Sequence, residues 1–132
     1  MPGEQILVID DNLTNLKLLE LLLRSEGYVM LAAQDAEQAE LVLTHLSPAL
    51  ILMDLQLPGV DGLTLTRRLK ADPRTSAIPI VAVTSSSLAE DEGRAAAAGC
   101  AAYVTKPIDT RSLPKLIAAH LAPRATRPTD EG

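Results

Sequence analysis

The sequence is poor in aromatic residues and in cysteine. Its 132 residues include two tyrosines, no tryptophan, no phenylalanine and a single cysteine, Cys100. So few aromatic rings argue against a site that sandwiches a planar cofactor such as a flavin. One cysteine excludes an internal disulfide and a cysteine cage for a metal, and it is typical of a protein kept in a reducing compartment.

The chain also lacks a long apolar run and an excess of positive charge. No segment approaches the roughly 18 consecutive apolar residues of a membrane-spanning helix, and no signal-peptide pattern is visible. The formal net charge is -5, and the 12 lysines and arginines are scattered along the chain. These features argue against membrane insertion and against nucleic-acid binding, and they predict a soluble, cytoplasmic protein.

What the sequence does contain is an alternation of strand-like and helix-like segments, with a hydrophobic content of 47%. Strands are expected over residues 5–9, 28–33, 49–54, 78–83 and 101–105, and helices over 13–25, 35–45, 62–70, 88–98 and 112–121. Such alternation predicts one α/β domain, a parallel sheet with helices on both faces. The domain is expected to span residues 1–121, and residues 122–132 are expected to form a disordered tail or a truncated linker.

Polar residues stand at the carboxyl ends of four expected strands, namely Asp10 with Asp11, Asp54, Thr84 and Lys106. Parallel strands bring these ends to one rim of the sheet, where ligands bind in such folds. Three carboxylates at one rim repel one another unless a hard cation such as Mg²⁺ lies among them. A carboxylate beside Mg²⁺ can accept a phosphoryl group, whose oxygens the lysine and the threonine can contact. The site is therefore equipped to be phosphorylated on an aspartate.

Four motifs, taken in order, are specific enough to indicate a family. They are Val8-Ile9-Asp10-Asp11-Asn12, the run from Leu52 to Gly62 around Asp54, Val81-Ala82-Val83-Thr84-Ser85 and Tyr103-Val104-Thr105-Lys106-Pro107. With them the chain resembles the receiver domain of two-component response regulators over roughly residues 5–121. The resemblance implies a flavodoxin-like, doubly wound α/β fold with a five-stranded parallel sheet of order 2-1-3-4-5.

The resemblance also implies roles for individual site residues. Asp54 is expected to be the phosphoacceptor, and Lys106 matches the lysine that binds the phosphoryl group. The Mg²⁺ ligands are expected to be Asp10, Asp11, Asp54 and the main-chain carbonyl of Gln56.

A second set of implied features concerns the response to phosphorylation. Thr84 and Tyr103 match the family's switch pair, and the bond between Lys106 and Pro107 is expected to be cis. The polar run Ser85-Ser86-Ser87 is expected to cap the next helix, which is rich in alanine and therefore weakly packed. The output surface implied is the face formed by the fourth helix, the fifth strand and the fifth helix.

The resemblance further implies partners. A histidine kinase or a histidine phosphotransfer protein is expected to donate the phosphoryl group, and a downstream protein is expected to bind the output face of a monomer or a phosphorylation-dependent dimer. Residues 11–15, Asp-Asn-Leu-Thr-Asn, are similar to those of phosphorelay receivers, including stand-alone ones. Such a protein is a switch, not an enzyme, with at most self-phosphorylation and self-dephosphorylation activity.

Three alternatives come from other classes of protein. A haloacid-dehalogenase-like phosphatase uses a similar aspartate, but it needs a second acid where this chain has Gln56. A flavin carrier of the same fold would want a glycine- and hydroxyl-rich phosphate loop after the first strand, where the chain has Asp10 and Asp11. A receiver-like scaffold that is never phosphorylated would normally have lost a site residue, and none is missing.

Overall fold

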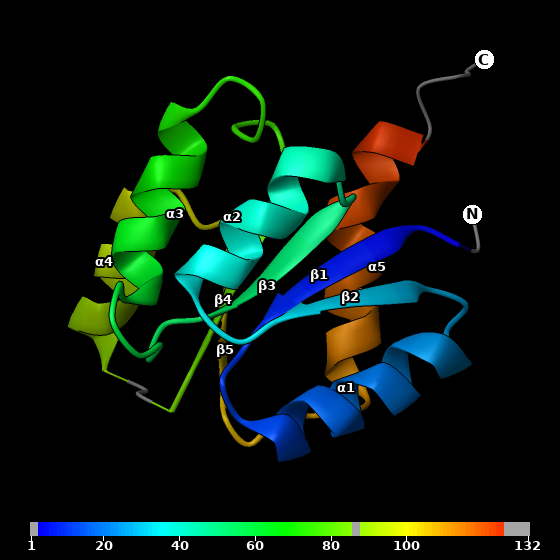
Figure 1. The fold of residues 1–132 in the computed structure, drawn as a ribbon. Coiled ribbons are helices and arrows are strands. Elements are labelled where there is room, and N and C mark those ends of the chain that lie inside the picture. Colours follow the sequence, from blue (N-terminus) through cyan, green and yellow to red (C-terminus); the bar gives the residue numbers. More distant parts are fainter. Residues whose placement is uncertain (1–2, 86–87, 126–132) are drawn as a thin grey trace.

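The computed structural model describes residues 3–85 and 88–125, which contain five strands and five helices in alternation (Figure 1). They are β1 (Gln5–Ile9), α1 (Leu13–Ser25), β2 (Val29–Ala33), α2 (Ala36–His45), β3 (Leu50–Asp54), α3 (Gly62–Ala71), β4 (Ile80–Thr84), α4 (Ala89–Ala98), β5 (Ala102–Thr105) and α5 (Ser112–Ala125). The order of elements predicted from the sequence is confirmed. Among the described helices, none combines the length and apolar character needed to cross a membrane.

The strands form a single parallel sheet of order β2-β1-β3-β4-β5, which confirms the flavodoxin-like arrangement. β3 lies at the centre, and all five of its residues are buried. A strand that is covered on both faces has no solvent side, which explains why its sequence is apolar without alternation. Because the strands all run in the same direction, their carboxyl ends share one edge of the sheet.

Helices cover both faces of the sheet, with α1 and α5 on one face and α2, α3 and α4 on the other (Figure 1). The core beneath α1 and α5 includes Ile6, Val8, Leu50, Leu52, Val81, Val83, Leu16, Leu19, Leu23, Leu113, Ile117 and Leu121. The opposite core includes Leu7, Ile9, Ile51, Met53, Ile80, Ala36, Ala39, Leu65 and Leu69. Successive strand residues point to opposite faces, so β1, β3 and β4 are anchored in both cores. The strand ends that carry the site are therefore held firmly.

α4 is packed less firmly than the helices on the other face. Its buried residues are the two alanines Ala95 and Ala98, whereas α1 buries three leucines. In the structure the residue before the first turn of α4 is Leu88, and Ser85, the described residue of the expected serine cap, instead donates its hydroxyl to Gln56. A leucine side chain has no hydrogen-bond acceptor, and no side-chain cap is formed. Residues 86–87 of the expected cap lie outside the described residues.

α5 begins at Ser112, so that Pro114 falls in its first turn, as predicted. Proline is tolerated there because the first N–H groups of a helix have no partner within it. The helix continues to Ala125 and therefore includes residues 122–125, which were expected to belong to the tail. The added turn includes Pro123, which has no N–H to donate, so helix propensity does not explain the extension. Residues 126–132 lie outside the described part of the chain.

Candidate functional site

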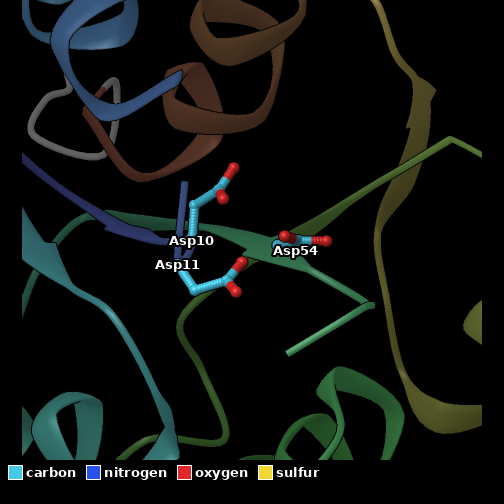
Figure 2. Close-up of side chains that lie close together, drawn as sticks. All are labelled: Asp10, Asp11 and Asp54. Carbon is cyan, nitrogen blue, oxygen red and sulfur yellow. The ribbon is translucent and has the colours of Figure 1, made fainter. Parts of the chain in front are cut away.

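Three carboxylates meet at the carboxyl edge of the sheet. Asp10 and Asp11 directly follow β1, and Asp54 is the last residue of the neighbouring β3 (Figure 2). One oxygen from each carboxylate lies within 4.8 Å of the others. Asp10 and Asp54 are 2% and 3% exposed, whereas Asp11 is exposed. The structure thus brings together the three acids that the sequence indicated, and two of them are almost completely shielded from solvent.

Asp54 is held by two donors, one on each carboxylate oxygen. The backbone N–H of Gln56 donates to Oδ1 at 2.9 Å, and the ammonium of Lys106 donates to Oδ2 at 3.3 Å. Burial raises the pKa of Asp54 and the charge of Asp10 raises it further, while the Gln56 N–H and Lys106 act in the opposite direction. The net effect is a raised pKa, with burial as the largest cause.

Lys106 lies between two of the acids. Its Nζ is 3.3 Å from Asp54 Oδ2 and 3.6 Å from Asp10 Oδ2, and its side chain is 21% exposed. The backbone supports this position, since the Lys106 N–H donates to the Thr84 carbonyl at 2.7 Å. The bond between Lys106 and Pro107 is cis, as expected. Lys106 contacts two of the three clustered carboxylates and carries one positive charge, so with all three acids ionised the group keeps an excess of negative charge.

Both carboxylate oxygens of Asp10 accept hydrogen bonds from the start of α1. The backbone N–H of Asn12 donates to Oδ1 at 2.8 Å, and the side-chain amide of Asn15 donates to Oδ2 at 3.3 Å. No role in the site was predicted for Asn15. The spacing of the two asparagines could have indicated this role. Residues three positions apart share a face of a helix, and Asn12, the cap of α1, lies two positions after Asp10.

The neighbouring strands carry the two expected switch residues. Thr84 is buried at the end of β4, one position beyond the Val83 that pairs with Asp54. Tyr103 lies on β5 opposite Ala82 and is half-buried. It borders two hollows, one of about 600 Å³ along β5 and α5 and one of about 130 Å³ against α4.

A further contact crosses the mouth of the site and was not foreseen from the sequence. Ser85 lies just after β4, and Gln56 lies just after β3. The Ser85 hydroxyl donates to the side-chain carbonyl of Gln56 at 2.9 Å. It joins the loop after the central acid to the loop after the expected switch threonine. The metal ligand expected from Gln56 is its main-chain carbonyl, which is a different group and remains a prediction.

Residues 6–118 of the chain match the family model of the response regulator receiver domain. The chain belongs to the response regulator receiver domain family. Among the curated relatives of this receiver is the polar-differentiation response regulator DivK of Brucella anthropi, which is 38% identical over 114 residues, or 86% of this chain and 90% of the relative. The DivK protein of Brucella abortus is likewise 38% identical, with the same coverage. The receiver is therefore part of two-component signalling, in which the general role of the family is that of a phosphoaspartate switch.

Solved receivers have the same fold. The receiver domain of the sensor histidine kinase PA1611 from Pseudomonas aeruginosa PAO1 is 32% identical with a TM-score of 0.84, covers 91% of this chain and 98% of its own, and is described with a magnesium ion in its active-site cleft. A CheY-like receiver from Methanospirillum hungatei JF-1 is 25% identical with a TM-score of 0.86, covering 95% and 98%. These matches favour the receiver over the phosphatase and the flavin carrier.

Proposed function

We propose that this receiver accepts a phosphoryl group on Asp54 from a phosphohistidine of a histidine kinase or a histidine phosphotransfer protein, with Mg²⁺ bound, and signals by binding another protein. The observation that supports this most directly is the position of Asp54, with Lys106 on one oxygen and two further acids beside it. We place this exchange in the cytoplasm, where ATP supplies the phosphoryl groups.

The donor set fits Mg²⁺. Every side-chain ligand offered by Asp10, Asp11 and Asp54 is a carboxylate oxygen, the type that a hard cation prefers, and the cluster has excess negative charge. The main-chain carbonyl of Gln56 would complete the set on the protein side. When bound, Mg²⁺ would neutralise charge that develops on the phosphoryl oxygens during transfer.

The transfer itself requires the ionised Asp54 carboxylate. One of its oxygens attacks the phosphorus of the phosphohistidine, so that an O–P bond forms and the P–N bond breaks. The electron pair of the broken bond remains on the imidazole nitrogen, which takes a proton from solvent. Lys106, now 3.3 Å from Asp54, can then pair with a phosphoryl oxygen, and the Thr84 hydroxyl can donate to another.

The output is proposed to leave through α4, β5 and α5. Movement of Thr84 toward the phosphoryl group would draw the β4–α4 loop inward, and Tyr103, which borders a hollow against α4, could then change its rotamer. A downstream protein would bind the altered face, on a monomer or on a phosphorylation-dependent dimer. A partner that prefers one state by about 2 kcal/mol discriminates roughly 30-fold.

The test is intact-mass measurement after incubation with Mg²⁺ and an acyl phosphate. The wild-type protein should gain one phosphoryl group, and Asp54→Asn should gain none, because an amide cannot form the acyl phosphate. Asp61→Asn, which changes an acid that caps α3 outside the cluster, is the matched control and should still be phosphorylated. A mass gain that persists in Asp54→Asn would show that another residue is the phosphoacceptor. A wild-type protein that is never modified would show the assignment to be wrong and favour a scaffold.

A further inference from the structure

We infer that Asn15 is a positioning residue of the metal site, because its side-chain amide holds the Asp10 carboxylate in the orientation that a divalent cation requires. This inference rests on the proposed function, in which Asp10 is a Mg²⁺ ligand. The amide of Asn15 lies 3.3 Å from Asp10 Oδ2, and the Asn12 N–H lies 2.8 Å from Oδ1. Asp10 is 2% exposed, so these protein groups, more than water, orient it.

The Asn15 side chain is not needed to start α1. The cap of this helix is made by the side chain of Asn12, which accepts from the backbone N–H of Asn15 at 3.1 Å. Any residue at position 15 except proline supplies that N–H group. Asparagine is a weaker helix former than alanine or leucine, so the helix alone does not account for its presence. The side-chain contact with Asp10 does.

The charge of the donor matters as much as its place. Lys106 Nζ also approaches Asp10 Oδ2, at 3.6 Å, but a positive group beside a metal ligand opposes the arrival of a cation. An amide donor carries no net charge, so it can fix the carboxylate without cancelling the charge that attracts Mg²⁺. When Lys106 moves to a phosphoryl group on Asp54, the Asn15 contact on Oδ2 can remain. Asn15 therefore orients Asp10 both before and after phosphorylation.

The test compares Mg²⁺ affinity among variants of one helical turn, by isothermal titration calorimetry with Mg²⁺ alone. Asn15→Ala should weaken binding about tenfold, the lower end of the range for partners that orient metal ligands. Thr14→Ala is the matched control, since it makes the same polar-to-alanine change at an exposed position of the same turn. Its affinity should stay within twofold of wild type. Asn15→Gln, which keeps an amide donor, should recover part of the lost affinity.

Thermal unfolding in EDTA separates positioning from support of the fold. Asn15→Ala should change the melting temperature little without metal, because the helix propensity of alanine and the retained cap offset the lost hydrogen bond to Asp10. The inference is overturned if Asn15→Ala binds Mg²⁺ as tightly as Thr14→Ala. It is also overturned if Asn15→Ala loses both Mg²⁺ affinity and metal-free stability, and Asn15→Gln restores neither the affinity nor the stability. Mass measurement on the same samples tests the proposed function separately. If the wild-type protein binds Mg²⁺ and is phosphorylated, and Asn15→Ala binds Mg²⁺ with the same affinity, the inference about Asn15 is overturned while the proposed function stands.

Discussion

At the scale of single residues, the main feature is a buried charge that the metal-free fold does not favour. Asp54 is 3% exposed and lies beside Asp10, and burial raises its pKa above the ordinary value of 3.8. Lys106 and the Gln56 N–H compensate in part. Ionised Asp54 therefore costs the folded protein free energy at neutral pH, and we interpret this cost as a consequence of its proposed role as phosphoacceptor.

Replacing Asp54 by asparagine should raise the free energy of unfolding of the metal-free protein at neutral pH. Because the pKa of Asp54 is higher in the folded state than in the unfolded state, the folded state binds more protons in the window from 3.8 up to the raised value. The free energy of unfolding of the wild-type protein therefore falls as pH rises through this window. The gain in free energy of unfolding from Asp54→Asn should be largest at pH values above the window and should disappear below pH 3.8. Urea unfolding in EDTA across this pH range measures it. If Asp54→Asn is less stable at every pH, the contact with Lys106 outweighs burial.

At the scale of elements, the start of α3 lies against the end of β3 with no room for a side chain. A Cβ atom on Gly62 would lie 2.5 Å from the Asp54 carbonyl oxygen and 2.6 Å from the Leu55 Cα. The Gly62 N–H donates to the Leu55 carbonyl at 3.2 Å, which fixes this approach. The β3–α3 loop that leaves Asp54 therefore returns to the site through a position only glycine can occupy.

Gly62→Ala should destabilise the protein by about 1 to 3 kcal/mol, the usual cost of overpacking, and should slow phosphorylation because the backbone of Asp54 must shift. The matched control is Gly93→Ala in α4, where a Cβ meets nothing within 4 Å. That substitution should stabilise by roughly 0.4 to 1 kcal/mol. Urea unfolding of the two variants gives the comparison, and equal effects from both would contradict the close approach at Gly62.

The weak packing of α4 makes a second prediction about elements. When a phosphoryl mimic such as beryllofluoride is added with Mg²⁺, the largest changes in amide exchange outside the site should fall in residues 88–103, because α4 buries only Ala95 and Ala98. Thr84→Ala should still be phosphorylated but should show smaller changes in this segment. If the largest changes occur in α1 instead, the proposed output through α4 and β5 is incorrect.

At the scale of the whole molecule, the proposed metal site would link two strand ends. Asp10, Asp11 and Asp54 come from two strands that adjoin only in the folded sheet, so Mg²⁺ held by them would bind the folded state in preference to the unfolded one. Ligand binding of this kind stabilises a protein by an amount set by the ratio of ligand concentration to Kd. Stability should therefore report on the integrity of the site.

Mg²⁺ at 100 times its Kd should add about 2.7 kcal/mol to the free energy of unfolding of the wild-type protein. Asp11→Ala should lose this gain and yet be no less stable than wild type without metal, since Asp11 is exposed and belongs to a mutually repelling cluster. Urea unfolding with Mg²⁺ and with NaCl of equal ionic strength distinguishes specific binding from screening. A clear loss of metal-free stability in Asp11→Ala would show that Asp11 has a structural role.

Much of this protein was determined locally by the sequence. The order of strands and helices followed from apolar runs and their breaks, and the acids, Thr84 and Lys106 were recognisable because each directly follows or ends an apolar run. The end of a strand can be predicted from the local sequence without knowledge of any distant contact. The strand order came from the resemblance to receivers, since periodicity shows that strands exist but not which ones are neighbours.

The tertiary structure alone decided the individual contacts. Lys106 and Asp54, 52 positions apart, were expected at the same rim, but their hydrogen bond was not. Ser85 and Gln56 are 29 positions apart, and the Asn15 amide reaches Asp10 only because α1 begins beside the end of β1. Such contacts depend on how strands and helices pack, which no local pattern encodes. Leu88 before α4 and the continuation of α5 to Ala125 were missed because helix ends depend on small differences in free energy between alternative boundaries.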